Sequence, residues 1–392
     1  MARLQEERSH LLNGTAARNA ARHTFAAHCR VLLVPVAALC AICYVVLQQR
    51  PGALVNPADS IGVVGVDNPA VIHFMFMVVD GVFHVDIWKA FFASAPEGSY
   101  RIWLHCKYPD KCRKADVYQL PGLQMVSTVQ SQWCDDLVTP ATHMLKAALA
   151  SQASLRVRRM DKFVLLSDST LPVKPFPVVH DILTQSTISD LCLYAAEYWS
   201  HGSGHLNSSW LVMAHEWFVL SHDDARTLVD YWVPPNLSTP LHGRRYFVPF
   251  KVPLHGARWS TLNQTTTTES FPDLAGCPDE LAVFTILYGA IDSGWSSRAY
   301  VRGFGEVDMY AEQEQGRCRT LVLWDYEPRE QELLYSAKDG SEFRPSTSRE
   351  PGVIVNLGPE VMSSLRNSSY LFVRKVSANA SLHGYTQRVL AI

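Results

Sequence analysis

The stretch from Ala70 to Cys106 reads AVIHFMFMVVDGVFHVDIWKAFFASAPEGSYRIWLHC, and it decides the class of fold. Its first part, Ala70 to Val79, is apolar apart from one histidine, which is the pattern of a buried strand. Helical periodicity follows from Val82 to Ala95, and Tyr100 to Cys106 is a second strand. A strand, a helix and a strand at this spacing form a parallel βαβ unit, so the sequence predicts an open α/β sheet.

The alternation of helices and strands continues downstream. Lys162 to Leu166 is a short apolar strand that runs into the polar turn Ser167-Asp168-Ser169. Ligands favour this place in such sheets, because the binding side lies at the carboxyl ends of the strands. The other expected helices are Thr139 to Ala150, Pro177 to Leu183 and Pro278 to Ile286, and the other expected strands are Leu191 to Ala195, Trp217 to Leu220 and Leu321 to Trp324.

An uncharged apolar run near the N-terminus, Val31 to Leu47, predicts a membrane anchor. Its length is at the short end of the roughly 17–25 residues that cross a bilayer as a helix. Arginines precede the run, and by the positive-inside rule the bulk of the chain is then translocated. We therefore expect a cytoplasmic tail at 1–30, a transmembrane signal anchor at 31–48, a stem at 49–69 and a lumenal domain at 70–392. A cleaved signal peptide is the alternative, although its apolar region is usually only about 7–15 residues long.

Glycosylation signals and cysteines agree with a lumenal domain. Sequons for N-glycosylation begin at Asn207, Asn236, Asn263, Asn367 and Asn379. The cysteines beyond the expected anchor are Cys106, Cys112, Cys134, Cys192, Cys277 and Cys318. An even number in an oxidising compartment permits three disulfides in any of about 15 pairings. None of them shows close CxxC spacing, so a structural zinc site is not expected.

The composition is that of a large globular chain. Of its 392 residues, 47% are hydrophobic and 18% are charged, which is ample for a buried core. The formal net charge is −2, and this balance argues against nucleic acid as a partner because phosphate binding needs a concentrated basic face.

Five stretches carry motifs of one enzyme family. Lys162 to Leu183, KFVLLSDSTLPVKPFPVVHDIL, has a strand ending in F-V-L-L-S-(D/E)-S, then a proline-containing loop and a helix. The other four are Val71 to Phe92, His215 to Val229 (HEWFVLSHDDARTLV), Cys277 to Leu287 (CPDELAVFTIL, with a P-D-E helix start) and Ser369 to Val376 (SYLFVRKV). In this order they resemble the core-2/I-branching β-1,6-N-acetylglucosaminyltransferase family, glycosyltransferase family 14, over about residues 70–378.

The resemblance implies a GT-A-type glycosyltransferase fold, a UDP-sugar donor, inversion at the anomeric carbon and no divalent metal. Metal-dependent enzymes of that fold usually hold the ion on a D-x-D pair, because hard cations prefer oxygen ligands. No two aspartates of this chain stand two residues apart. Glu306-Val307-Asp308 is the nearest substitute, and we interpret it as a solvated loop. We therefore expect no metal and no cofactor besides the UDP-sugar substrate.

Inverting transfer needs a base that takes the proton from the attacking sugar hydroxyl. The resemblance gives this role to Glu280, the glutamate of the P-D-E segment. The alternative is structural, since acidic residues in the first turn of a helix complement its dipole. Asp279 beside it is expected either at the helix start or in contact with the acceptor.

The departing diphosphate needs a positive counter-charge. The resemblance assigns it to Lys375, in the family's L-F-x-x-K segment, with Arg374 as a helper. The alternative is an exposed basic pair on a terminal helix. Arg349 is nearest to a second basic position of the family, but it is out of register.

Donor and acceptor contacts complete the expected site. Ser167, Asp168 and Ser169 are expected to line the donor site because they follow a buried strand, unless they only form a turn. Glu216 and Trp217 match the acceptor-side segment of the family, and the alternative for Trp217 is a core position.

Three departures mark the chain as a divergent member. The family's H-x-D after the second strand is HCK here, at His105 to Lys107, which affects uridine recognition. Ala214 and His215 replace the usual Gly-Ser, and the family's W-G is Trp133-Cys134.

The sequence as a whole predicts a Golgi, single-pass type II membrane glycosyltransferase. It would move a sugar, GlcNAc by family default, from a UDP-sugar to a glycan or glycoprotein acceptor. Xylosyl and glucuronosyl transfer are alternatives. A lumenal glycan-binding protein that kept the fold and lost transfer is the alternative from a different class.

Overall fold

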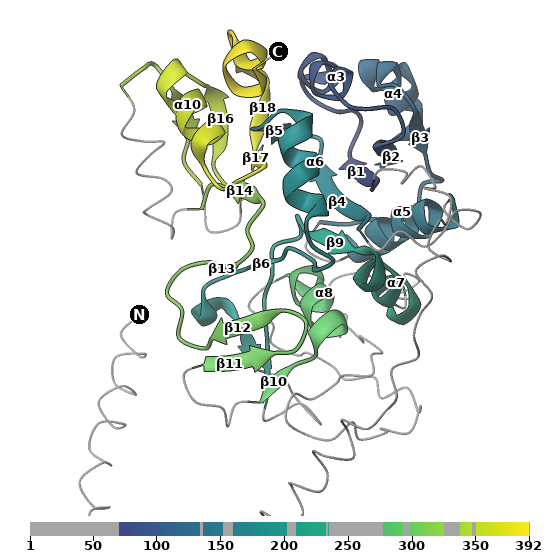
Figure 1. The fold of residues 1–392 in the computed structure, drawn as a ribbon, viewed down its shortest axis with the longest axis vertical. Helices are drawn as coiled ribbons and strands as arrows, with labels where there is room; N and C mark the ends of the chain where they lie inside the picture. Colours follow the sequence, from purple (N-terminus) through teal and green to yellow (C-terminus); the bar gives the residue numbers. More distant parts are fainter. Residues whose placement is uncertain are drawn as a thin grey trace, which may run out of the picture. The chain divides into compact units, whose positions relative to one another are not determined.

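The strand–helix–strand unit expected from the sequence forms the centre of a five-stranded sheet in the computed structural model (Figure 1). The strand order is β3 (Leu123–Met125), β2 (Tyr100–Cys106), β1 (Ile72–Val78), β4 (Lys162–Ser167) and β9 (Val219–Ser221). The first four strands are parallel to one another, and β9 runs antiparallel to β4. The chain is therefore a mixed α/β protein with a mostly parallel sheet, as the sequence predicts.

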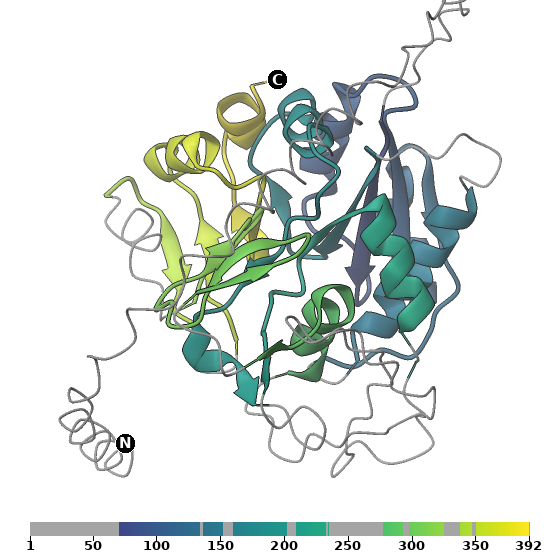
Figure 2. The same cartoon turned by 60° about the horizontal axis from the view of Figure 1, so that its bottom comes forward.

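Helices flank both faces of this sheet (Figures 1 and 2). They are α3 (Val85–Ala93), α5 (Val138–Ser151), α6 (Phe176–Thr184), α7 (His222–Tyr231) and α8 (Pro278–Tyr288). Alternate side chains of β1 enter two different cores because successive residues of a strand point to opposite faces. Phe74 and Phe76 pack with α3 and α6, whereas Met75 and Met77 pack with α5, α7 and α8.

The remaining elements form smaller sheets and short helices around this sheet. They are α4 (Pro109–Lys114), η1 (Asp116–Gln119), β5 (Leu171–Pro172), β6 (Cys192–Leu193), η2 (Ala196–Tyr198), β7 (Ser200–His201), β8 (Ser209–Leu211), β10 (Ile291–Asp292), β11 (Arg298–Val301), β12 (Gly305–Asp308), β13 (Gln315–Gly316), β14 (Thr320–Val322), β15 (Glu342–Arg344), β16 (Val353–Asn356), α10 (Pro359–Asn367), β17 (Phe372–Arg374), β18 (Val376–Ser381) and η4 (Thr386–Leu390). The structure describes residues 70–133, 136–151, 160–201, 209–232, 234, 277–292, 298–324, 338–346 and 350–391.

Strand β17 joins the C-terminal part of the chain to the segment that follows β4. It pairs antiparallel with β5, with Val373 opposite Leu171. The N–H of Val376 also donates to the carbonyl of Ser169 at 2.9 Å. The C-terminal basic pair therefore lies beside the turn that follows β4, although about 200 residues separate them in the sequence.

Two sequence expectations are corrected by these elements. Glu306 to Asp308 was expected to be a solvated loop, but it lies in β12 and pairs with β11. The reason is a period of two across the hairpin, in which Ala299 and Val307 are buried while Tyr300 is exposed. The alternative of a terminal helix for the basic pair is also wrong, because Arg374 ends a strand.

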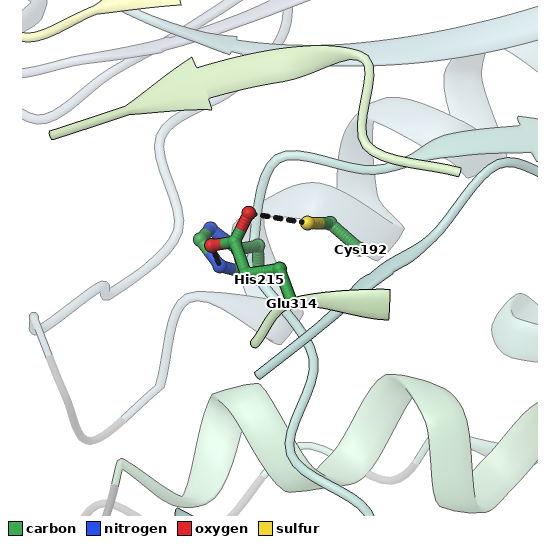
Figure 3. A group of neighbouring side chains, drawn as sticks. All are labelled: Cys192, His215 and Glu314. Carbon is green, nitrogen blue, oxygen red and sulfur yellow. Dashed lines mark hydrogen bonds and ion pairs between the residues drawn. The ribbon is translucent and has the colours of Figure 1, made fainter. Parts of the chain in front are cut away.

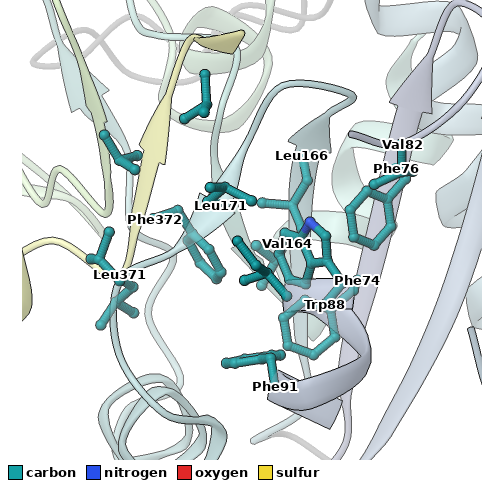
Figure 4. Packing of buried hydrophobic residues seen from close by; sticks show 14 of the residues in the cluster. Phe74, Phe76, Val82, Trp88, Phe91, Val164, Leu166, Leu171, Leu371 and Phe372 are labelled. Carbon is teal, nitrogen blue, oxygen red and sulfur yellow. The ribbon is translucent and has the colours of Figure 1, made fainter. Parts of the chain in front are cut away.

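Trp88 is the hub of the core between the sheet and α3 (Figure 4). It is fully buried, and its ring centroid lies 4.9 Å from that of Phe76, 5.5 Å from that of Phe91 and 6.4 Å from that of Phe372. Its indole N–H donates to the carbonyl of Thr170 at 3.2 Å. One side chain thus joins β1, α3, the turn after β4 and β17.

Replacing this side chain is expected to destabilise the whole domain. Trp88→Phe removes one ring, leaves a small void and orphans the carbonyl of Thr170, which together should cost about 2–3 kcal/mol. Chemical denaturation of the full chain measures this free energy of unfolding. Tyr108→Phe is the control, since that ring is 48% exposed, and it should change the free energy by less than about 0.5 kcal/mol.

Disulfides tie several of these segments together. Cys106 is bonded to Cys112, and Cys192 to Cys318. Cys277 is disulfide-bonded as well, so every cysteine in the described ranges is oxidised.

Several expectations fall on other parts of the chain. The tail at 1–30, the anchor at 31–48, the stem at 49–69 and the sequons at Asn207, Asn236 and Asn263 lie outside the described residues. Within the described residues, no helix is both long enough and apolar enough to span a membrane. Asn367, at the end of α10, and Asn379, in β18, are exposed, so both sequons are open to modification.

Candidate active site

Helix α8 begins with two buried carboxyl groups. Cys277 precedes the helix, Pro278 is its first residue, and Asp279 and Glu280 lie in its first turn. The side chain of Asp279 is 3% exposed and that of Glu280 is 8% exposed. An acidic residue that only complements a helix dipole has no need of burial, which disfavours ionisation. Burial therefore weakens the purely structural interpretation of this pair.

An extended segment through Tyr194 holds the start of α8. The N–H of Tyr194 donates to the carbonyl of Met213 at 3.0 Å, and the N–H of Ala214 donates to the carbonyl of Glu280 at 2.9 Å. This arrangement brings the two side chains together: the hydroxyl of Tyr194 donates to Oε1 of Glu280 at 2.8 Å. One oxygen of the buried carboxyl group is thus fixed by a neutral donor.

Arg374 and Trp217 also belong to the group of side chains around Glu280. The guanidinium carbon of Arg374 lies 4.0 Å from the ring centroid of Trp217, a cation–π contact. Trp217 is itself 9% exposed, so it is a buried residue that also serves as a platform for the cation. The positive charge lowers the pKa values of Glu216, Glu280 and Asp168, although burial has the larger, opposite effect on each.

The pKa of Glu280 is raised to about 8. Burial is the largest cause and the charge of Glu216 adds to it, while the hydrogen bond from Tyr194 and the charge of Arg374 act in the opposite direction. A general base works best when its pKa lies near the operating pH, because it then combines basicity with a usable deprotonated fraction. Glu280 has this property without a ligand present.

Asp279 and Glu216 share the environment of Glu280. Burial raises the pKa of Asp279 well above its ordinary value, and the charges of Glu216 and Glu280 raise it further. Burial also raises the pKa of Glu216. Neither carboxylate oxygen of Asp279 has a hydrogen-bond partner on another of the described residues. A carboxylic acid can both donate and accept hydrogen bonds, so Asp279 can satisfy a ligand hydroxyl there. We call Glu216, Asp279, Glu280 and Arg374 the carboxylate cluster.

The turn after β4 contributes one side chain to this region. The hydroxyl of Ser167 bonds the hydroxyls of Ser169 (3.2 Å) and Thr170 (2.8 Å), and both Ser167 and Ser169 are buried. These hydroxyls stabilise the turn, which favours the turn-forming interpretation for the two serines. Asp168 between them is partly exposed, and its carboxyl group interacts with Arg374 and Lys375.

Lys375 differs from its neighbour Arg374. Its side chain is partly exposed, and the charge that it presents to Asp168 is weaker than that of Arg374. The guanidinium group of Arg374 contacts the ring of Trp217 and interacts with the charges of Glu216, Asp168 and Glu280. The basic pair therefore offers two different cations, one that organises carboxylates and one at the edge of the cluster.

His215, Glu314 and Cys192 lie together (Figure 3), and the imidazole of His215 stacks on the ring of Tyr194. His215 forms an ion pair with Glu314, and Oε2 of Glu314 is 3.1 Å from the sulfur of Cys192. His, Glu and Cys are all metal-ligand types, but this sulfur is bonded to Cys318 and provides no thiolate. The remaining imidazole and carboxylate contact each other, so the group is better explained as a buried His–Glu pair.

A second buried network lies beside β4 and has a structural explanation. Asp190 forms an ion pair with Arg317 at 2.8 Å and accepts a hydrogen bond from Arg319 at 2.9 Å, and the ammonium group of Lys162 donates to the carbonyl of Ile188. These interactions join three chain segments and give each buried charge an ionic or hydrogen-bonding partner. We assign this network to stability.

The structure thus brings together most of the residues that the sequence singled out. Glu280, Asp279, Glu216, Trp217, Arg374 and Asp168 share one interacting group, with Lys375 at its edge. Sequence reasoning missed Tyr194 and Glu314, and it treated His215 only as a departure from the family. Arg349 lies outside the described residues. Lys107, which stands where the resemblance leads one to expect an acid, is exposed just after β2.

Comparison with known proteins adds no assignment. No protein-family model matches the chain, and no curated protein matches its sequence.

Proposed function

We propose that the chain is an inverting glycosyltransferase of GT-A type, as its resemblance to the core-2/I-branching family implies. The single observation that carries the proposal is the buried Glu280 carboxyl group, held by Tyr194 and raised in pKa to about 8. It belongs to the second half of an α/β domain whose sheet is mostly parallel, the class of sheet that binds ligands at its strand ends. The proposed donor is a UDP-sugar, with GlcNAc as the first choice and xylose or glucuronic acid as alternatives.

In the proposed reaction Glu280 takes the proton of an acceptor hydroxyl. The oxygen of that hydroxyl forms a bond to the anomeric carbon of the donor sugar, on the face opposite the diphosphate. The bond between that carbon and the diphosphate oxygen breaks, and UDP leaves with the electron pair. Lys375 offers the counter-charge for the leaving diphosphate, and Asp279 and Glu216 offer hydrogen bonds to acceptor hydroxyls.

The rate is expected to rise with pH up to about 8. Glu280 is active only when deprotonated, and its pKa is about 8, so kcat/KM should fall tenfold for each pH unit below that value. The measurement is UDP release by the full chain between pH 5.5 and 9 at saturating acceptor. A rate that is flat over this range would remove Glu280 from the role of base.

The proposal places the chain in the Golgi membrane as a type II protein, with the anchor at 31–48 and a lumenal domain. The oxidised state of the described cysteines supports a lumenal domain, because disulfides persist in oxidising compartments. Proposed partners are the UDP-sugar, a glycan or glycoprotein acceptor and the membrane, but no nucleic acid.

A glycan-binding protein without transfer activity is the second candidate. The observation that favours it is Lys107, a cation at the end of β2 where the related family has an acid near the nucleoside. Calorimetric titration with UDP separates the two candidates. A transferase binds UDP, whereas the second candidate binds glycans in the presence or absence of UDP.

A further inference from the structure

The side chain of Tyr194 has a place in the cluster that the proposed reaction leaves unexplained. Its hydroxyl donates to Oε1 of Glu280 at 2.8 Å. Its ring is stacked on the imidazole of His215, with centroids 4.1 Å apart and planes at 16°. His215 is in turn ion-paired with Glu314 and is 4% exposed. Contacts to both the hydroxyl and the ring of Tyr194 thus fix the orientation of this side chain.

The backbone adds to this support. The N–H of His215 donates to the carbonyl of Cys192 at 2.8 Å, and the disulfide from Cys192 to Cys318 joins the neighbouring segment. The indole N–H of Trp199 donates to the carbonyl of Tyr194 at 3.0 Å. The tyrosine is therefore held by contacts to three separate segments of the chain before any substrate binds.

A donor fixed on one oxygen of a carboxylate has two consequences. It stabilises the charged form of the group, and so keeps the pKa from rising further. It also occupies Oε1 and leaves Oε2 of Glu280 to accept the proton of the acceptor hydroxyl. Three other charged groups lie near Glu280: Glu216 raises its pKa, Arg374 lowers it, and the neighbouring Asp279 interacts with its charge.

We propose that Tyr194, stacked on the His215–Glu314 pair, is the positioning residue of the base: it aims Oε2 of Glu280 at the acceptor and keeps the carboxylate available. This inference rests on the proposed function. Tyr194 takes no part in bond making, since the proton goes to Glu280.

The test is the pH profile of Tyr194→Phe. Without the hydroxyl, the pKa of Glu280 rises, so the acidic limb of kcat/KM should move up by about one pH unit and activity at pH 6.5 should fall about tenfold. The KM for the donor should stay within about twofold. Tyr288→Phe is the matched control, because that buried hydroxyl donates to Asp224 at 3.1 Å, away from the cluster. It should lose similar stability and keep the wild-type pH profile. An unmoved limb in Tyr194→Phe overturns the inference.

His215→Gln tests the support, because it keeps a polar partner for Glu314 and removes the stacked ring. His215→Gln is then combined with Tyr194→Phe. If His215 acts through Tyr194, this double variant loses no more turnover than the worse of the two single variants. If the losses of turnover from the two substitutions added up, His215 would act independently of Tyr194 and this part of the inference would be wrong.

A second measurement decides the inference even if the wild type shows no turnover. Thermal unfolding midpoints are compared at pH 6 and pH 9 for the wild type, Tyr194→Phe, Glu280→Gln and the double variant. The hydrogen bond favours the charged carboxylate, so Tyr194→Phe should lower Tm by a few degrees more at pH 9 than at pH 6. That difference should vanish in the Glu280→Gln background. Equal losses at both pH values would show that the hydroxyl does not act on the charge of Glu280. Absence of turnover in the wild type would instead count against the proposed function.

Discussion

Glu280→Gln is expected to lower kcat by about 10³-fold while the affinity for UDP stays unchanged. The amide has the size of the acid and can still accept the hydrogen bond from Tyr194, but it cannot take a proton. Loss of a general base costs roughly 10²–10⁴-fold in rate. UDP release at pH 8 measures the rate, and calorimetric titration measures the binding of UDP.

The same variant has a signature that does not depend on activity. The folded-state pKa of Glu280 is about 8 against an ordinary value of 4.5, so the folded state binds the extra proton. Its contribution to stability is complete below pH 4.5 and is lost as the pH rises through 8. Glu280→Gln should therefore raise Tm relative to the wild type at pH 8.5 and bring little gain at pH 4.5. Full retained activity, with no such gain, would show that the carboxyl group is neither the base nor perturbed.

Arg374→Met is expected to cost about 10²–10³-fold in kcat/KM at pH 7. The methionine keeps an apolar contact with Trp217, but Glu216, Glu280 and Asp168 lose the cation that lowers their pKa values. A larger fraction of Glu280 is then protonated, and the site has less positive charge for the departing diphosphate. The acidic limb of the pH profile should move up together with the loss of rate.

Lys375→Met is the matched control for this variant. It removes the charge of Lys375, which lowers the pKa of Asp168 but is not among the main causes of the pKa shift of Glu280. We expect about tenfold weaker UDP binding and an unmoved pH profile. If Lys375→Met moved the limb and Arg374→Met did not, the division of roles within the basic pair would be wrong.

The sheet could be read from the sequence because its strands are buried on both faces. Such strands appear as continuous apolar runs, as in β1 and β4, and parallel strands need the intervening helix that the sequence also shows. Short strands carry less information. Leu191 to Ala195 was expected as one strand, but only Cys192–Leu193 pairs in a ladder. Its neighbours instead hold single hydrogen bonds to other segments, which no local pattern encodes.

The site was only partly predictable for the same reason. Glu280 and Lys375 came from short motifs. The pairing of β5 with β17 places Arg374 near the turn after β4, and its charge lowers the pKa of Glu280. Tyr194 lies 86 residues from Glu280 in sequence and stands in an apolar stretch, where it resembles an ordinary core residue. Glu314 belongs to a run of polar residues that looks solvated. Their function depends on which segments pair in space.

The two serines beside Asp168 show what a local pattern leaves open. Their place after a buried strand predicts donor contacts, and in the structure the hydroxyls of Ser167 and Ser169 bond each other within the turn. A turn of this kind uses some of its own side chains for stability.

The most direct test of the transferase account is UDP release by the purified full chain with UDP-GlcNAc, UDP-xylose and UDP-glucuronic acid, each with EDTA and with Mn²⁺. Mixed glycans serve as acceptors, and Glu280→Gln serves as the blank. The account predicts release from one donor that EDTA does not diminish and that falls about 10³-fold in the blank. If no donor and acceptor pair gave UDP release, the account would be contradicted, and a protein that binds glycans without transferring them would be favoured.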